Sequence, residues 1–131
     1  MNIYLDIDGV LLTKQGEPAS YLREFLDYIV QRHTPYWLTT HCKGDAGPTI
    51  AHLKRKLPPE LHTYLEAVRP TNWDVLKTDA IDFTKDFRWL DDAVMQSEEE
   101  VLQNHNALHK LISIDLQGKP ARLKEIIENQ L

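Results

Sequence analysis

Two carboxylates, Asp6 and Asp8, stand two residues apart at the end of an apolar stretch that begins at Ile3. Side chains i and i+2 of an extended segment share a face, so this spacing predicts that both carboxylates enter one small volume. Two carboxylates held that close repel each other, and one pKa rises unless a cation lies between them. Gly9 then lets the backbone turn sharply and approach a bound substrate closely. A carboxylate nucleophile, a carboxylate acid/base and a cation suit phosphoryl transfer, whereas an acidic turn after an edge strand is the structural alternative.

Polar residues also follow two later strands of the expected sheet. Thr39 and Thr40 come directly after a short apolar run, and Asp91 and Asp92 directly follow the run that ends at Leu90. In doubly wound α/β folds, ligands bind at the carboxyl edge of the sheet. The pattern therefore predicts that the polar residues after these strands meet in one site.

Strands and helices are predicted to alternate along the whole chain. The strands should run from Ile3 to the paired carboxylates and over residues 36–40, 87–90 and 111–114. This alternation predicts an α/β fold of three layers, with a doubly wound, Rossmann-like and mostly parallel sheet that carries helices on both faces. No repeat, low-complexity segment or linker interrupts the pattern, so residues 1–131 are expected to form one domain.

Apolar residues at helical spacing predict five helices, at residues 18–30, 48–57, 72–81, 94–108 and 121–131. Pro18 suits the first turn of the first helix, and Asn72 is a good N-cap for a helix that would carry Lys77. Glutamates 98–100 are expected on the solvated face of the fourth helix. Residues 61–69 fit either a short helix or a further strand, and the pattern does not decide between them.

Composition limits the classes of partner. Hydrophobic residues make up 42% of the chain and charged residues 27%, as in an ordinary soluble globular protein. The formal net charge of −5 offers no general attraction to nucleic acid, and the one basic run, residues 54–56, is expected on a solvated helix face. A single cysteine, Cys42, excludes an internal disulfide. The sequence shows no signal peptide and no membrane span, so we expect a cytoplasmic protein that does not bind membranes.

The order of these residues resembles the four motifs of the haloacid dehalogenase (HAD) superfamily. The matching positions are Asp6-Ile7-Asp8-Gly9-Val10, Thr39 after the second strand, Lys77 on a helix, and Asp91-Asp92 after a later strand. The resemblance covers nearly the whole chain, and the first motif is its most specific part. The order differs from that of response-regulator receiver domains, which carry the phosphorylated aspartate on a middle strand and the lysine after the last strand.

The resemblance implies a role for each acidic residue. Asp6 would attack phosphorus and form an aspartyl-phosphate, and Asp8 would serve as general acid and then as general base. The implied cofactor is Mg²⁺, held by Asp6, by the backbone carbonyl of Asp8 and by Asp91. Asp92 would hold a metal-bound water or steady Lys77.

The resemblance also implies contacts to the phosphoryl group. Thr39 would take phosphoryl oxygens through its hydroxyl and nearby backbone N–H groups, and Thr40 is the alternative. Lys77 would neutralise the charge of the phosphoryl group, with Lys54 and Lys85 as possible substitutes.

Many HAD relatives insert a cap domain between these motifs, whereas the short spacings in this chain leave no room for one. A capless site would be open, and could accept a bulky phosphorylated substrate such as a nucleic-acid end or a protein, or be closed by another subunit of a homo-oligomer. Two functions remain, a Mg²⁺-dependent phosphatase and a non-catalytic HAD-like binding module, and the intact set of site residues favours the phosphatase. His41 and Cys42 follow the site closely and are expected to be loop residues.

Overall fold

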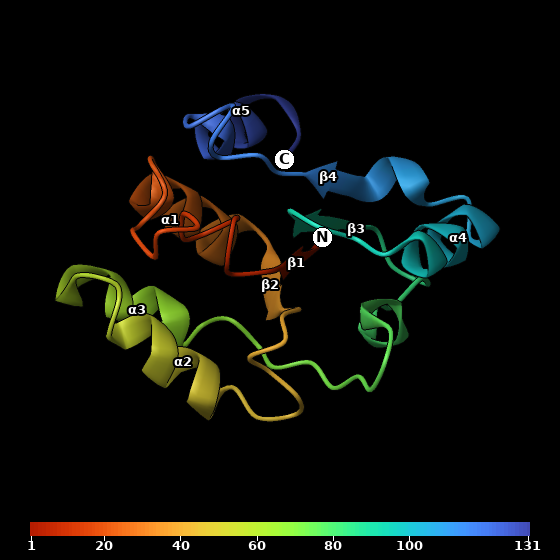
Figure 1. Cartoon of the computed structure of the whole chain (residues 1–131), viewed down its shortest axis with the longest axis horizontal. Coiled ribbons are helices and arrows are strands. Elements are labelled where there is room, and N and C mark those ends of the chain that lie inside the picture. The colour runs from red at the N-terminus through yellow and green to blue at the C-terminus, as the bar shows by residue number, and fades with distance from the viewer.

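The computed structural model describes residues 1–131 and contains a four-stranded sheet in which every strand is parallel to its neighbours (Figure 1). The strands lie in the order β2-β1-β3-β4. Their bounds are Asn2–Leu5 (β1), Thr34–Trp37 (β2), Phe87–Asp91 (β3) and Leu111–Ser113 (β4). The α-helices are Leu22–Arg32 (α1), Gly47–Lys54 (α2), His62–Leu65 (α3), Gln96–Asn104 (α4) and Arg122–Asn129 (α5). Short 3₁₀ turns span Pro59–Leu61, Lys77–Ala80 and Leu108–Lys110.

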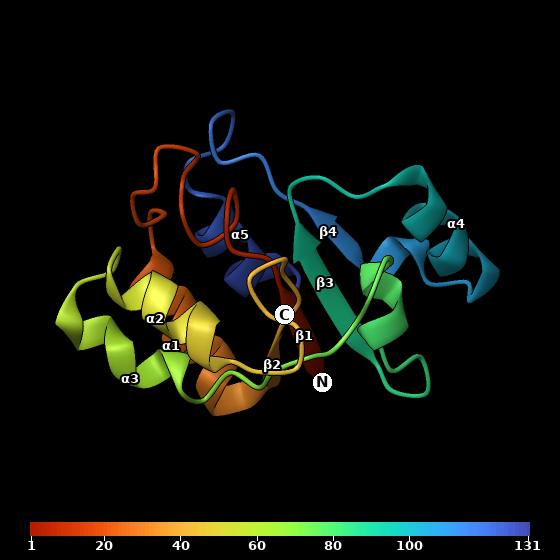
Figure 2. The same ribbon diagram turned by 60° about the horizontal axis from the view of Figure 1, so that its bottom comes forward.

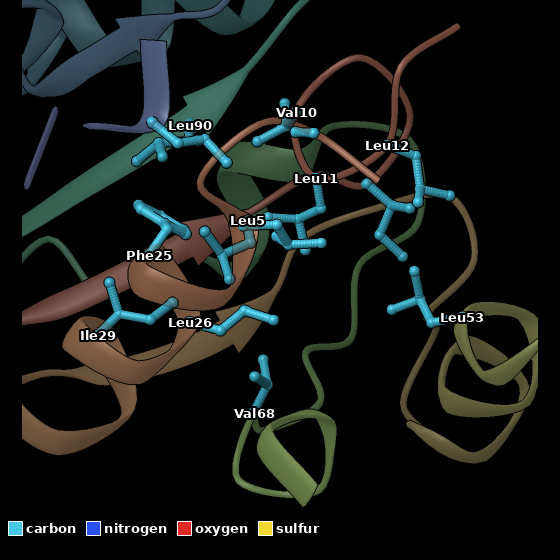
Figure 3. Close-up of a cluster of buried hydrophobic side chains, with 14 of the residues drawn as sticks. Leu5, Val10, Leu11, Leu12, Phe25, Leu26, Ile29, Leu53, Val68 and Leu90 are labelled. Carbon is cyan, nitrogen blue, oxygen red and sulfur yellow. The ribbon is translucent and has the colours of Figure 1, made fainter. Parts of the chain in front are cut away.

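Each face of the sheet has its own apolar cluster, because alternate side chains of a strand point to opposite faces. Ile3 and Leu5 of β1 belong to the larger cluster, which also contains buried side chains of α1 and α5. Figure 3 shows Leu5 beside Phe25, Leu26 and Ile29 of α1. Tyr4 belongs to the smaller cluster, beneath α4 and the turn Lys77–Ala80. Figure 1 shows α1 and α5 on one side of the strands and α4 on the other. The sheet is therefore the middle layer of three.

The prediction of an α/β fold is confirmed, and the all-parallel sheet is compatible with a Rossmann-like arrangement. β1 and β3 are neighbours in the centre of the sheet. From β1 the chain continues to β2 at one edge of the sheet, and from β3 it continues to β4 at the other edge. Connections that diverge in this way leave a crevice at the carboxyl ends of the two central strands, where open parallel sheets bind ligands. Figure 2 shows the loops after β1, β3 and β4 at that edge.

The second strand spans Thr34–Trp37 instead of residues 36–40, so Pro35 lies inside it and Thr39 and Thr40 lie beyond its end. The proline is tolerated since β2 is an edge strand and the missing N–H would face away from β1. On that outer side the Arg69 N–H donates to the Pro35 carbonyl (3.0 Å), and the Arg69 carbonyl accepts from Trp37 (2.8 Å). Residues 61–69 therefore form short helical turns that end at Leu65, followed by one bridging residue rather than a strand.

Several helix boundaries also differ from the prediction, among them the end of α2, which lies at Lys54 instead of residue 57. α1 begins at Leu22 instead of near Pro18, which is held in a bridge with Leu12 of the preceding loop. α4 ends at Asn104 because Asn106 adopts a left-handed φ of 54°, a conformation that ends helices.

The helix predicted from Asn72 does not form. The chain is irregular up to the 3₁₀ turn Lys77–Ala80. The Lys43 ammonium donates to the Asp74 carbonyl (2.7 Å) and lies 3.9 Å from the ring centroid of Trp73. These tertiary contacts override the local preference for a helix, which is a weak determinant on its own.

The segment between β2 and β3 contributes to the main core. Leu53 of α2 and Leu65 of α3 are buried in the larger cluster, beside the side chains of α1. Figure 1 shows α2 and α3 adjoining α1 rather than standing apart from it. None of the helices is both long and apolar enough to cross a lipid bilayer.

Candidate active site

Three carboxylates meet at the carboxyl edge of the sheet, beside the boundary between β1 and β3. Asp6 directly follows β1, Asp91 is the last residue of β3, and Asp92 comes next. The Asp6 N–H donates to the Leu90 carbonyl (3.1 Å), so the parallel pairing continues past β1 and fixes Asp6 beside Asp91. One oxygen from each of the three carboxylates lies within 4.8 Å of the others. Asp91 is buried, the Asp6 side chain is only 13% exposed, and Asp92 is partly exposed.

Lys77 supplies the cation of this cluster. Its ammonium contacts Oδ2 of Asp91 at 2.7 Å and lies 3.5 Å from Oδ2 of Asp6. The lysine is carried by a 3₁₀ turn rather than by the predicted helix. Lys54 and Lys85, the predicted substitutes, are exposed and form no ion pair with these carboxylates.

Glu98 is a site residue that the sequence pattern missed. The prediction that it lies on a solvated face is wrong, because only 3% of the residue is exposed. Its two carboxylate oxygens accept hydrogen bonds from the backbone N–H of Lys77 (2.7 Å) and of Met95 (3.1 Å). Glu98 therefore ties the turn that carries Lys77 to the start of α4. Its place in the first turn is that of a capping-box glutamate, which is the sequence signal that could have found it.

Thr39, rather than Thr40, contacts the carboxylates. Thr39 is fully buried, and its hydroxyl is close enough to the Asp6 carboxylate to lower the pKa of that group. The same hydroxyl accepts the His41 N–H at 3.3 Å, which fixes its orientation. Thr40 is exposed. Of the two threonines, Thr39 is therefore the one held at the site.

Asp8 has different surroundings from Asp6. The prediction that both carboxylates share one face of an extended strand is wrong, because β1 ends at Leu5. The Asp8 side chain is 62% exposed, and its Oδ2 lies 3.0 Å from Nε2 of His41. It groups with His41 and His52, outside the cluster of the other three aspartates. The Asp8 carboxylate therefore lies outside the group of side chains that could hold a metal beside Asp6.

His41 was expected to be an ordinary loop residue, but it contacts a candidate catalytic group. Its ring stacks on that of His52, with centroids 4.3 Å apart and 15° between the planes. Burial and the neighbouring His41 lower the pKa of His52, while Asp8 opposes this shift. Parallel rings do not direct their in-plane lone pairs to one point, so this stack does not favour a shared metal. Cys42, the next residue, is buried in the larger apolar cluster.

Gly9 packs directly against Asp92. It has φ +82°, in the left-handed region that glycine adopts without strain. A Cβ atom at this position would lie 2.2 Å from Oδ2 of Asp92. The lack of a side chain at Gly9 therefore allows the loop after β1 to touch the carboxylate after β3.

The protein alone does not balance the charge of the cluster. Burial and the nearby Asp91 raise the pKa of Asp6 to about 7, although Lys77 and two hydrogen bonds oppose the shift. Burial and Asp91 also raise the pKa of Asp92. Burial lowers the pKa of Lys77, but Asp6 and Asp91 outweigh it and the pKa is raised, so the ammonium stays charged. Three crowded carboxylates therefore share one ammonium.

This cluster suits a small divalent cation. Mg²⁺ prefers oxygen ligands at about 2.1 Å in an octahedron, which places opposite ligands about 4.2 Å apart. The oxygens of Asp6, Asp91 and Asp92 lie within 4.8 Å of one another, so small rotations of the side chains would bring them to that spacing. When all three carboxylates are ionised, the Lys77 ammonium leaves two of their negative charges uncompensated, and a bound divalent cation would offset them.

No family model matches this chain, and neither a curated protein nor a solved structure matches it. The chemistry of the site therefore follows from the geometry of its own residues.

Replacing Gly9 with alanine should destabilise the protein by displacing Asp92. Left-handed backbone strain alone costs a non-glycine residue about 1–3 kcal/mol, and the contact with the carboxylate adds to it. Gly16→Ala is the matched control, since its φ is +81° but its Cβ would meet nothing closer than 3.4 Å. Urea unfolding should therefore show the larger loss for Gly9→Ala. Equal losses in the two variants would contradict the contact between Gly9 and Asp92.

Glu98→Ala should lower the free energy of unfolding by about 1–3 kcal/mol for each backbone N–H that is left buried without an acceptor. Glu100→Ala, on the exposed part of the same helix, removes the same charge and atoms and serves as the control. Chemical denaturation of both variants measures the difference. A Glu98→Ala variant as stable as Glu100→Ala would mean that Glu98 does not hold the turn of Lys77.

Metal-free protein should lose stability through Asp6 as the pH rises. Its folded pKa of about 7 exceeds the unfolded value of about 3.9, so the folded state binds more protons between these values and stability falls from about pH 4 to pH 7. In the presence of EDTA, Asp6→Asn should therefore gain stability relative to wild type between pH 5 and pH 8. Asp8→Asn, at the exposed carboxylate, is the control and should keep the wild-type dependence. If the difference in free energy of unfolding between wild type and Asp6→Asn is the same at pH 5 and pH 8, the assignment of this pH dependence to Asp6 is wrong.

Proposed function

We propose that this protein is a Mg²⁺-dependent phosphatase of the HAD type, without a cap domain, that acts through an aspartyl-phosphate on Asp6. The observation that carries the proposal is the convergence of Asp6, Lys77 and Asp91 at the crevice between the two central strands. A carboxylate nucleophile, a cation for the phosphoryl group and a second carboxylate are the groups that such chemistry needs.

The order of the site residues along the fold supports the HAD assignment over a receiver domain. Asp6 follows the first strand of the chain, and Lys77 precedes β3 instead of following the last strand. Asp91 ends β3 beside Asp6, as expected of the last HAD motif. The α2–α3 segment is used in the main core, which agrees with a capless member.

In the proposed reaction, the Asp6 carboxylate attacks phosphorus as the bond to the leaving oxygen breaks. Asp8 gives that oxygen a proton, and then takes a proton from the water that hydrolyses the aspartyl-phosphate and regenerates Asp6. His41 holds the Asp8 carboxylate at 3.0 Å and so limits the directions from which it can act. A divalent cation bound by Asp6, Asp91 and Asp92 would supply charge stabilisation for the phosphoryl oxygens.

Thr39 and Lys77 position the reacting groups. The Thr39 hydroxyl accepts the His41 N–H and lies near Asp6, which supports its proposed role of binding a phosphoryl oxygen. The Lys77 ammonium sits between Asp6 and Asp91, so it can reduce the repulsion between the nucleophile and an anionic phosphoryl group. Glu98 fixes the backbone of this lysine and is a positioning residue.

Hydrolysis of acetyl phosphate and a panel of phosphorylated metabolites, with and without Mg²⁺, tests the proposal. Asp6→Asn should abolish turnover, because an amide is a poor nucleophile. Asp8→Asn should lower it by about 10²–10⁴-fold, the usual contribution of general acid–base catalysis. Asp79→Asn, at an exposed carboxylate on the Lys77 turn, is the control and should keep wild-type activity.

Two outcomes would contradict the proposal. Equal residual activity in Asp6→Asn and Asp8→Asn would place the nucleophile elsewhere. A rise in melting temperature with Mg²⁺ that Asp91→Ala removes, but with no turnover of any compound, would favour the non-catalytic binding module.

A further inference from the structure

A cavity of about 430 Å³ opens beside the carboxylate cluster, and the reaction above gives it no role. Gly9 and Asp92 line it, and Asp92 also belongs to the cluster of Asp6. A group seated in the cavity therefore lies next to the place where a phosphoryl group would meet Asp6. The volume falls in the range of about 300–1,000 Å³ that is typical of small-molecule pockets.

The walls of this cavity are fixed to the site by backbone hydrogen bonds. One wall follows β1, where the Gly9 N–H donates to the Leu12 carbonyl (2.7 Å). The other wall follows β4, where the Ile114 N–H donates to the Asp91 carbonyl (3.0 Å). The Asp115 carboxylate accepts the Gly118 N–H (3.1 Å), which closes the turn beyond it. The cavity is thus preformed, and little ordering is needed when a ligand enters.

The lining combines apolar surface with neutral hydrogen-bonding groups. Ile114, Leu116 and Pro120 provide the apolar part. Gln15 and Gln117 provide amides that both donate and accept. This combination suits a ring with hydroxyl groups, since the ring can pack on the apolar part while the hydroxyls reach the amides.

The charges on the lining disfavour a nucleic-acid strand. Lys14 is the only cation of the cavity, against the carboxylates of Asp92 and Asp115. Further phosphates of a strand would face both carboxylates with one lysine to compensate. A neutral leaving group avoids this repulsion.

We propose that the cavity binds the leaving group of a small phosphomonoester, an uncharged hydroxylated group of about the size of a sugar or a nucleoside. The inference rests on the proposed function and narrows its substrate class.

The test compares substrates that do and do not fill the cavity. Gln117→Trp places a large ring in the cavity from an exposed position, and Gln103→Trp makes the same change on an exposed position of α4 as the control. With ribose 5-phosphate and adenosine 5′-monophosphate, kcat/KM should fall at least about tenfold in Gln117→Trp, whereas with acetyl phosphate it should stay within about twofold. The double variant Gln15→Ala and Gln117→Ala should raise KM for the two larger substrates without blocking the cavity.

Binding measured by calorimetry on the Asp6→Asn background keeps the outcome separate from catalysis. Adenosine 5′-monophosphate or ribose 5-phosphate should bind this variant, and adding Gln117→Trp, but not Gln103→Trp, should abolish the binding. If Gln117→Trp abolishes binding but the wild-type protein hydrolyses none of the compounds, the cavity is a ligand site and the phosphatase proposal fails. Unchanged binding and unchanged kcat/KM in Gln117→Trp and in the double variant would overturn the inference. It would also be overturned if kcat/KM for acetyl phosphate fell in these variants as much as kcat/KM for the larger substrates. A 5′-phosphorylated oligonucleotide hydrolysed with a higher kcat/KM than the small substrates would also overturn it.

Discussion

The ion pair between Lys77 and Asp91 is the contact on which the site depends. Two neighbouring parallel strands end at the same edge of the sheet, so Asp6 and Asp91 are brought together whatever their charges. Buried carboxylates without a partner are costly, and only the Lys77 ammonium lies within ion-pair distance of both. Because the side chains of Lys77 and Asp91 are only 11% and 1% exposed, removing either partner would leave a buried charge unpaired. Lys77 and Asp91 therefore depend on each other, and their pairing also keeps an ammonium next to the Asp6 carboxylate.

The rest of the fold holds this set in place through backbone groups. Glu98 of α4 binds the N–H of Lys77, so the helix after β3 controls the lysine that precedes it. Gly9 lies against Asp92, so the loop after β1 and the loop after β3 cannot move independently. The order β2-β1-β3-β4 places these connections around one crevice. The loop after β1 and helix α4 after β3 therefore both hold charged side chains of the site in place, through Gly9 and Glu98 respectively.

Local patterns were sufficient for the parts of the site that follow strands. The apolar runs before Asp6, Thr39 and Asp91 predicted three strand ends, and a parallel sheet brings such ends to one edge. Tertiary contacts decided the rest. A helix from Asn72 was a sound local prediction, but the long-range contacts of the chain hold a 3₁₀ turn at Lys77 instead. Nothing in the adjacent acidic residues marks Glu98 as the buried one apart from its place near the start of α4.

Asp8 and Asp92 have different surroundings, so the site has two distinct sides. Asp8, whose carboxylate lies 3.0 Å from His41, is on an exposed side where water can reach it, which agrees with its proposed role as general acid and base. Asp92 faces the side where the cavity is enclosed by the loops after β1 and β4. The α2–α3 segment is packed into the main core, so in the proposed phosphatase such loops, rather than a cap, would select the substrate. Both loops are anchored to the strands that carry Asp6 and Asp91, so a group that fits between them is aligned with the carboxylates as it binds.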